Sequence, residues 1–578
     1  MRQRISNSSL PFSLLPGICI FLFFLKGYPY HLHYQEQNQL FLLTTDYLTA
    51  IISHPGGFSQ YLAGFITQFY IHPWLGALLI AALLVSLQQA ALIFMRTINV
   101  PKLFYSFSIL PIFLYWALLC NENYMLSAVI AQLLVLIVGI VYARQKSPLV
   151  RICSMPILLI LLFILAGGIY HTLFLFMLLT EILYFRQLSR GQWIIFLTVN
   201  ILVIIGLPLF TKYICLAPYP FRQLWEGIGY YRYPAIFPVW LPAIWGITVC
   251  LPFILRFLPQ SSAKKGKRLQ IVFPAAIFLL GGLLIYSQYK PETEERMHYD
   301  YLLRHKQWNN ILEIARTKTP DTPLSTMAVN LSLQQTGQLA NRMFYFPQNG
   351  PEGLLPFLDN NYNTAFAYGE VYYHLGMINT AQRIAFEGME SIPDYQKSAR
   401  AIKRLAETNL INGHYAVAGK YLRMLQKTFF YRLWANRTME LLTHEDKLNK
   451  HPEYGRLRAM RPQDDRLFSE YNKPNMLASQ FAKQPANRPV GEYLIALALL
   501  NKDLGSFMSM LPSAEKWHQF MPVHYQEALL LAWAEANTKD PIPPVIDPMV
   551  VRRFNEFRKN REGHSNTYWD YYFGKVTK

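Results

Sequence analysis

Long apolar runs alternate with short polar linkers over the first 288 residues of the chain. A helix crosses the ~30 Å hydrocarbon layer of a membrane with about 17–25 apolar residues, and these runs have that scale. The longest run, 152–185, is long enough for two crossings, so the eight runs predict nine crossings in all. The runs lie at residues 10–26, 73–95, 103–120, 124–143, 152–185, 193–211, 236–257 and 270–287.

Every second linker between these runs is rich in lysine and arginine. Cytoplasmic loops of membrane proteins are rich in these residues, so the pattern predicts sidedness as well as crossings. It predicts a cytoplasmic N-terminus and places everything after residue 288 on the opposite side of the membrane. The charges are Arg2, Arg4, Arg96, Lys102, Arg144, Lys146, Arg151, Arg186, Arg190, Lys264, Lys265, Lys267 and Arg268.

The run 152–185 has basic linkers at both ends, which a single crossing does not satisfy. A helical hairpin broken at Ala166-Gly167-Gly168 restores the alternation, since paired glycines relax helical geometry. Two thin crossings and a partly re-entrant element lining a cavity both fit this pattern. We expect Glu181 to extend to the membrane interface near Arg186. A functional role for a carboxylate in the membrane is the alternative.

The second half, residues 289–578, changes to helix formers with 3.6-residue periodicity. Short turns near 305–308, 337–340, 375–379 and 412–415 recur at intervals typical of stacked helical repeats. The sequence resembles tetratricopeptide repeats most clearly over 364–394 and 398–428. The predicted fold class is therefore all-α: a polytopic transmembrane domain over 1–288, then a tetratricopeptide-like α-solenoid over 289–578. A generic helical bundle is the alternative for the second half.

The composition limits the kinds of binding partner that we expect. The net charge is +19, but much of the basic excess of the first half lies in linkers beside apolar runs, where it faces anionic lipid. The second half has no dense basic run interleaved with aromatic residues, so we expect a lipid bilayer and no nucleic acid among the partners. The five cysteines lie in the first half without CxxC spacing, which argues against a zinc or redox site.

Candidate chemistry concentrates in the long first outer loop, 27–72. Its acids are Glu36 and Asp46, and a carboxylate on the aqueous side can deprotonate a hydroxyl group or bind a divalent metal. His31 and His33 flank Leu32 and would share one face of a strand, although a third metal ligand is missing. Solvated loop carboxylates and ordinary interfacial histidines are the alternatives.

Two further segments are candidate binding elements. His54-Pro55-Gly56-Gly57 predicts a turn, with a phosphate cradle of glycine amides as the alternative. In the outer loop 212–235, Arg222 and Arg232 are suited to bind a lipid pyrophosphate. An aromatic interfacial loop is the alternative interpretation of that segment.

The large first outer loop, the acid Glu36 soon after the first run and the external C-terminal domain together resemble the GT-C superfamily of polyprenyl-phosphate-dependent glycosyltransferases. The resemblance implies transfer of a sugar from a polyprenyl-phosphate carrier in cell-envelope glycan assembly. Glu36 or Asp46 would then act as base or metal ligand, and Arg222 or Arg232 would hold the phosphate. The Asp/Glu pair common in that superfamily is absent, because Gln37 follows Glu36.

The chain also resembles uncharacterised multi-pass membrane proteins of Bacteroidetes-type bacteria. This resemblance implies a bacterial inner membrane with a periplasmic second half, but no reaction follows from it. The second functional hypothesis is therefore non-enzymatic. The apolar runs would anchor a periplasmic repeat scaffold that binds a partner protein, as helical solenoids commonly do. A transporter is disfavoured, since it calls for internal symmetry and several intramembrane charges.

Overall fold

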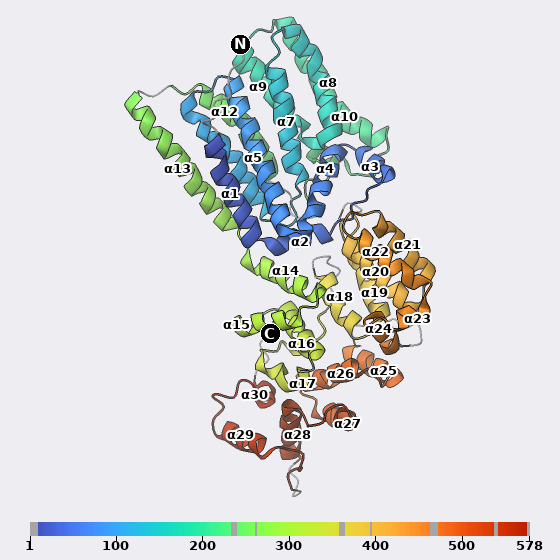
Figure 1. Cartoon of the computed structure of the whole chain (residues 1–578). Coiled ribbons are helices and arrows are strands. Elements are labelled where there is room, and N and C mark those ends of the chain that lie inside the picture. Colours follow the sequence, from blue (N-terminus) through green and yellow to red (C-terminus); the bar gives the residue numbers. More distant parts are fainter. Residues whose placement is uncertain are drawn as a thin grey trace. The chain divides into compact units, whose positions relative to one another are not determined.

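The computed structural model describes residues 10–232, 240–259, 263–357, 364–393, 396–462, 472–536 and 541–574. Within these ranges every regular element is a helix, and the only strand-like pairing is an isolated bridge between Tyr124 and Tyr231. The chain divides into two compact units, shown in Figure 1. Unit 1 comprises Met1–Glu294, Pro393–Gln396 and Lys427–Phe430, and unit 2 comprises the remainder.

Among its described residues, unit 1 contains five helical segments that are long and apolar enough to cross a membrane, with Pro148–Phe185 counted as one, or six if a bent pair counts as one span. Its helices are α1 (Leu10–Lys26), α2 (Pro29–Gln37), α3 (Thr45–Ile52), α4 (Gly57–Thr67), α5 (Pro73–Thr97), α6 (Leu110–Leu119, after the 3-10 helix Lys102–Ile109), α7 (Ser127–Ala143), α8 (Pro148–Ala166), α9 (Tyr170–Leu179, continued by the π-helix Thr180–Phe185), α10 (Arg190–Tyr213), α11 (Phe221–Glu226), α12 (Trp240–Arg256) and α13 (Ala263–Gln288).

The expectation of nine crossings is therefore wrong for the described residues. The helices α7 and α12 are apolar but only 17 residues long, which is the lower limit for crossing the hydrocarbon layer. The helices α1 and α2 meet at a bend of 74°. The bent pair therefore includes residues of the expected loop 27–72. Arg2, Arg4 and the start of the expected run 236–257 lie outside the described residues.

The helices α8 and α9 form a hairpin, as the sequence predicts. The Nε atom of Arg151 lies 2.6 Å from Oε1 of Glu181, although 30 residues separate them. A straight helix rises 1.5 Å per residue and would hold these residues about 45 Å apart. The reversal occurs at Gly167, which has a φ of +79°, within the short 3-10 turn Gly167–Ile169.

Glu181 is held inside unit 1 by a buried ion pair. Its side chain and that of Arg151 are both fully buried, and the Tyr142 hydroxyl donates a hydrogen bond of 2.8 Å to Glu181 Oε1. Our expectation that Glu181 extends to the interface is wrong, because Arg151 supplies the charge partner inside the protein. A paired and hydrogen-bonded carboxylate does not need to reach water.

The tip of the hairpin is packed between the turn before α4 and the end of α11. The backbone N–H of Gly56 donates a hydrogen bond of 3.0 Å to the Ile164 carbonyl, and a Cβ on Gly56 would lie 3.2 Å from the Ala166 carbonyl oxygen. On the other side, a Cβ on Gly168 would overlap the Trp225 carbonyl oxygen. Backbone therefore meets backbone at this tip, which only glycine allows.

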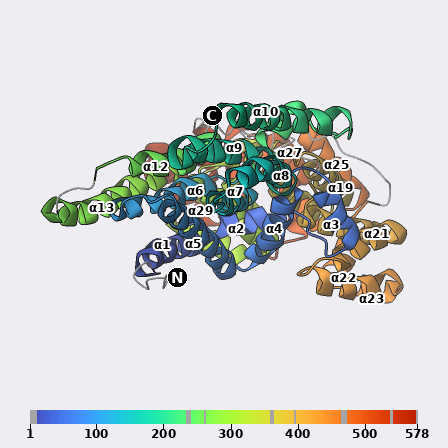
Figure 2. The ribbon, with the colours of Figure 1, turned by 90° about the horizontal axis from the view of Figure 1, so that it is seen from above.

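The rest of unit 1 packs around these elements. The helix α1 lies beside α5 in both views of the ribbon (Figures 1 and 2). The helices α10 and α13 lie at the edges of the unit, where many of their apolar side chains are exposed. Exposed apolar side chains on long helices are typical of a surface that faces lipid.

Unit 2 is built from short helices joined by tight turns. They are α14 (Pro291–Arg304), α15 (Trp308–Thr317), α16 (Pro323–Gln335), α17 (Leu339–Arg342), α18 (Ala365–His374), α19 (Ile378–Glu390), α20 (Ala399–Asn412), α21 (Tyr415–Gln426), α22 (Arg432–Met439), α23 (Glu445–Asn449), α24 (Tyr454–Met460), α25 (Lys473–Lys483), α26 (Arg488–Leu500), α27 (Leu504–Glu515), α28 (Val523–Glu535), α29 (Pro548–Lys559) and α30 (Tyr568–Phe573). The first turn of α14 belongs to unit 1.

The four turns that the sequence predicts in this half are present. Each lies between two consecutive helices, and Gly376 and Gly413 adopt the left-handed conformation with φ of +78° and +83°. The helices α18, α19, α20 and α21 each pack against the next one in the chain. The small residues Ala381 and Ala418 are buried, as expected where antiparallel helices cross closely.

We predict that Gly168→Ala destabilises unit 1 by about 1–3 kcal/mol, the usual cost of forcing atoms into a packed site. The matched control is Gly206→Ala in α10, where a Cβ meets no atom within 4 Å. It should leave stability unchanged or raise it slightly, because alanine is the better helix former. Thermal unfolding of the detergent-solubilised chain measures both. Equal melting temperatures for the two variants would contradict the packing described at the tip.

Candidate functional site

The candidate residues of the first outer loop lie mainly on α2. His31 and Glu36 are buried with exposed fractions of 1% and 3%, and His33 is half-buried. Residues two apart on a helix point to different faces, so His31 and His33 do not share the face that a strand would give them. Among the described residues, no group of three or more His, Cys, Asp or Glu is placed to hold a metal ion.

The first turn of α2 binds a carboxylate that the sequence analysis missed. Glu294 accepts hydrogen bonds from the backbone N–H groups of Tyr30, at 2.7 Å, and His31, at 3.1 Å. Unpaired N–H groups at a helix N-terminus favour a negative group. Glu294 thus anchors α2 to the segment that follows α13, and no local sequence signal connects two positions so far apart.

Arg232 is brought to α2, whereas Arg222 is not. Arg232 is fully buried, and its guanidinium lies 5.9 Å from the centre of the Tyr34 ring. Arg222 is 55% exposed and forms an ion pair of 2.8 Å with Glu226, four residues away. The structure therefore places Arg232 against the helix that carries Glu36 and leaves Arg222 in a local surface pair.

The remaining loop candidates are separate from this cluster. Asp46 is exposed in the first turn of α3, where a carboxylate stabilises the helix N-terminus. His54 precedes the turn into α4, and its ring packs edge-on against Tyr219 at 5.7 Å. The predicted turn at 54–57 is present, and the amide of Gly56 is occupied by the Ile164 carbonyl. That bond removes the central donor from the alternative phosphate cradle.

A charged pocket in unit 2 is the strongest candidate site, and the sequence analysis did not identify it. It has a volume of about 130 Å³ and combines five basic with three acidic side chains. Asp300 adds a fourth carboxylate behind Arg400, so one positive charge remains in excess. The lining residues are Arg304, Lys306, Glu370, Arg400, Lys403, Arg404, Glu407, Trp434, Glu453 and Tyr454.

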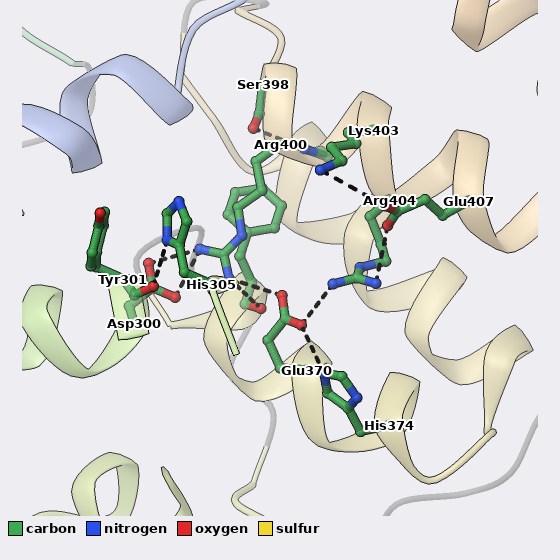
Figure 3. A network of polar contacts seen from close by, with 12 residues as sticks. Asp300, Tyr301, His305, Glu370, His374, Ser398, Arg400, Lys403, Arg404 and Glu407 are labelled. Atoms are coloured by element: carbon green, nitrogen blue, oxygen red, sulfur yellow. Dashed lines mark hydrogen bonds and ion pairs between the residues drawn. The ribbon is translucent and has the colours of Figure 1, made fainter. Parts of the chain in front are cut away.

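Glu370 of α18 is the centre of the network beneath this pocket, shown in Figure 3. Its carboxylate points between two guanidinium groups of α20. Arg404 Nη2 lies 2.6 Å from Oε2, and Arg400 Nη2 lies 3.2 Å from Oε1. Arg400 also binds both oxygens of Asp300 through Nη1, at 2.7 and 2.8 Å. Three helices, α14, α18 and α20, are therefore joined by one set of ion pairs.

The arginines keep Glu370 ionised in spite of its burial. Burial by itself raises the pKa of the Glu370 carboxyl, but Arg404 and Arg400 outweigh it and lower that pKa to about 2. His374, one turn further along α18, is also buried, and burial lowers its pKa to about 3 although Glu370 opposes the shift. At neutral pH the pocket floor therefore holds a carboxylate, two guanidinium groups and a neutral imidazole.

Aromatic rings position the cations of the pocket. The Arg404 guanidinium lies 3.5 Å from the centre of the Tyr373 ring, and the Lys403 ammonium lies 4.9 Å from that of Trp434. Glu407 binds Arg404 at 3.1 Å and lies 3.9 Å from Lys403. Cation–π contacts and ion pairs together hold these side chains in one arrangement.

The local sequence accounts for part of this geometry. Arg400, Lys403, Arg404 and Glu407 follow helical spacing, so α20 presents them on one side. Ser398 caps the start of α20 by accepting a hydrogen bond from the Ala401 N–H at 3.1 Å. A charged stripe of this kind usually faces water, and only the packing of α18 and α14 turns it inward.

The fold and the site define a class: an all-helical protein with several helices apolar enough to cross a membrane and a second helical unit with a net-positive pocket. The chain belongs to the family of unknown function DUF6057, which matches residues 4–575. No curated protein matches the chain, and no solved structure matches it.

We predict that Glu370→Gln destabilises unit 2 by about 3 kcal/mol at neutral pH, since it leaves two buried guanidinium groups without their shared carboxylate. Glu370 has a folded pKa of about 2 against an ordinary value of 4.5. Its stabilising contribution is therefore complete above pH 4.5 and is lost as the pH falls toward 2. The difference in melting temperature between the natural chain and the variant should narrow over the same interval.

The control for this measurement is Glu390→Gln, which removes an exposed carboxylate paired with Lys397. Exposed pairs contribute little, so this variant should unfold like the natural chain at every pH. A Glu370→Gln effect that is constant from pH 2 to pH 7 would show that the pairing with the arginines is not its source.

Proposed function

We propose that the protein is a membrane-anchored binding protein whose second helical unit captures a partner through a negatively charged group. The observation that carries this proposal is the convergence of five basic side chains on one pocket that keeps a net positive charge. Buried and partly buried cations of this kind favour an anionic ligand. The apolar helices of unit 1 would hold this unit at a lipid bilayer.

The location and repeat character of the second unit belong to the same proposal. The alternation of basic linkers supports a bacterial inner membrane with a cytoplasmic N-terminus and a periplasmic second unit. The regular turns and the packing of α18 to α21 in chain order support an irregular tetratricopeptide-like solenoid. A periplasmic protein or another molecule with an acidic group would bind on it.

The test is an anion panel on the full-length chain in maltoside detergent. Sulfate, phosphate, acetate and citrate are compared with chloride at equal ionic strength, because general screening changes with salt. We expect at least one of them to raise the melting temperature. The double variant Arg304→Gln/Lys306→Gln, which removes two lining cations, should weaken that effect at least tenfold in apparent affinity.

The matched control is Lys420→Gln/Arg423→Gln, which removes two exposed cations of α21 outside the pocket. It changes the net charge equally and should leave anion binding intact. If no anion stabilises the chain, or if both double variants lose the effect alike, the pocket is not an anion site and the proposal fails.

A polyprenyl-phosphate-dependent glycosyltransferase is the second candidate. The placement of Arg232 against α2, the helix that carries Glu36, favours it. In that reaction Glu36 would act as base, and a divalent metal would assist if one is bound. We predict that Glu36→Gln abolishes transfer to a cell-envelope glycan while Asp46→Asn, on an exposed helix, keeps it. Glycans that are unchanged in a clean deletion strain would exclude this function.

A further inference from the structure

One cation of the unit 2 pocket has unused hydrogen-bonding capacity. The Lys403 ammonium lies 3.9 Å from its nearest carboxylate oxygen, on Glu407, which is beyond hydrogen-bonding distance. Its second neighbour is the face of Trp434, at 4.9 Å from the ring centre. Among the described residues it donates no hydrogen bond, and its side chain is 35% exposed. The ammonium is therefore partly accessible to an incoming ligand.

The other cations are already bound to groups of the chain itself. Arg400 binds Asp300 and Glu370, and Arg404 binds Glu370 and Glu407. Planar guanidinium groups are the usual partners of carboxylates, and here the chain's own carboxylates occupy them. Lys306 pairs with Glu453 at 2.6 Å at the pocket edge. Arg304 Nη2 donates a hydrogen bond of 2.9 Å to the Tyr431 hydroxyl. A ligand would thus find Lys403 less engaged by the chain than Arg400, Arg404 and Lys306.

Size and shape narrow the ligand class. The volume of about 130 Å³ is many times the ~10–15 Å³ that a cavity needs to hold one water molecule. It is well below the ~300–1,000 Å³ of pockets that enclose a whole small-molecule ligand. Ammonium groups are point charges that suit an anion with oxygens in several directions, as in a phosphate. The pocket therefore has room for one compact anionic group such as a phosphate.

We propose that the unit 2 pocket binds a phosphate group, with the Lys403 ammonium as the main donor to its oxygens and Arg400 and Arg404 remaining in their ion pairs as positioning residues. This proposal deepens the proposed function and rests on it. The group can be free phosphate or part of a lipid headgroup. The chemistry at Lys403 is the same in both cases.

The charges around Lys403 agree with this assignment. Burial lowers the pKa of Lys403; Glu407 opposes the shift, and Arg304, Arg404 and Lys306 add to it. The ammonium therefore lies among more positive than negative neighbours. A bound anion relieves the mutual repulsion of these cations, which stabilises both the ligand and the protonated lysine.

The experiment measures phosphate binding to the full-length chain in maltoside detergent by isothermal titration calorimetry. The probes are inorganic phosphate, a monomeric short-chain phosphatidylglycerol and acetate, at equal ionic strength. We expect phosphate groups to bind more tightly than acetate. Lys403→Gln should weaken phosphate binding by about tenfold or more, as expected for the loss of a charge-assisted hydrogen bond. Lys403→Arg should keep most of the affinity.

Lys397→Gln is the matched control, because Lys397 is an exposed lysine of unit 2 that pairs with Glu390. It should bind phosphate like the natural chain. Thermal unfolding without ligand verifies that each variant is folded. Tighter binding of the free ion assigns the site to phosphate itself, and tighter binding of the phosphatidylglycerol assigns it to a headgroup; either result supports the proposal.

Two results would overturn it: phosphate binding that Lys403→Gln leaves unchanged, or acetate binding as tight as that of phosphate. If phosphate does not bind but another anion does, and the Arg304→Gln/Lys306→Gln variant loses it, this inference fails and the proposed function stands. If no anion binds at all, both fail together.

Discussion

The buried carboxylate of Glu370 is the constraint on which the pocket of unit 2 depends. A charge removed from water costs several kcal/mol unless cations and hydrogen-bond donors replace the solvent. Arg400 and Arg404 of α20 meet that requirement, so α18 and α20 are fixed at one distance and rotation. Asp300 extends the same pairing to α14. The position of each helix therefore follows from the charge that it helps to neutralise, and the pocket is formed between side chains that cannot move independently.

In unit 1, specific contacts likewise hold the hairpin of α8 and α9 at both of its ends. At one end Arg151 and Glu181 neutralise each other inside the protein, with Tyr142 as an additional donor. At the other end glycines let three segments meet backbone to backbone, since any side chain would occupy the space between them. The hairpin is thus held at one end by an ion pair and at the other by close backbone contacts that glycine allows. Neither the ion pair nor the glycine contacts depend on the apolar character of the run 152–185. That character by itself only favours a helix in a membrane.

The functional consequence is a difference between the two halves. In unit 1, the polar residues of the first outer loop that suggest a transferase are buried, locally paired or dispersed over separate helices. In unit 2, basic side chains converge on a pocket that is partly open, held by ion pairs at its floor and net positive. The proposed capture of an anionic group follows from this second arrangement. The family to which the chain belongs has no assigned reaction, so the chemistry of the pocket is the more direct guide to function.

Sequence reasoning succeeded where the signal is local. Helical periodicity and the glycine turns are properties of neighbouring residues, and they correctly located the turns at 375–379 and 412–415 and the reversal at 166–168. The predicted number of crossings was too high, because apolar composition does not show that a helix is short, as α7 is, or that it meets the next helix at a sharp bend, as α1 does. Charge alternation required a reversal within 152–185, and the ion pair between Arg151 and Glu181 shows it in three dimensions.

The sequence by itself determined an all-helical chain with a strongly apolar first half and a polar, turn-punctuated second half, since these features depend on spacing and composition. Only the tertiary structure decided which charged residues are buried together. Asp300, Glu370 and Arg400 are distant in the chain, and each one alone resembles an ordinary surface residue. Their roles arise from packing, because a charge acquires a partner, a shifted pKa and a binding capacity only from the groups that folding brings to it.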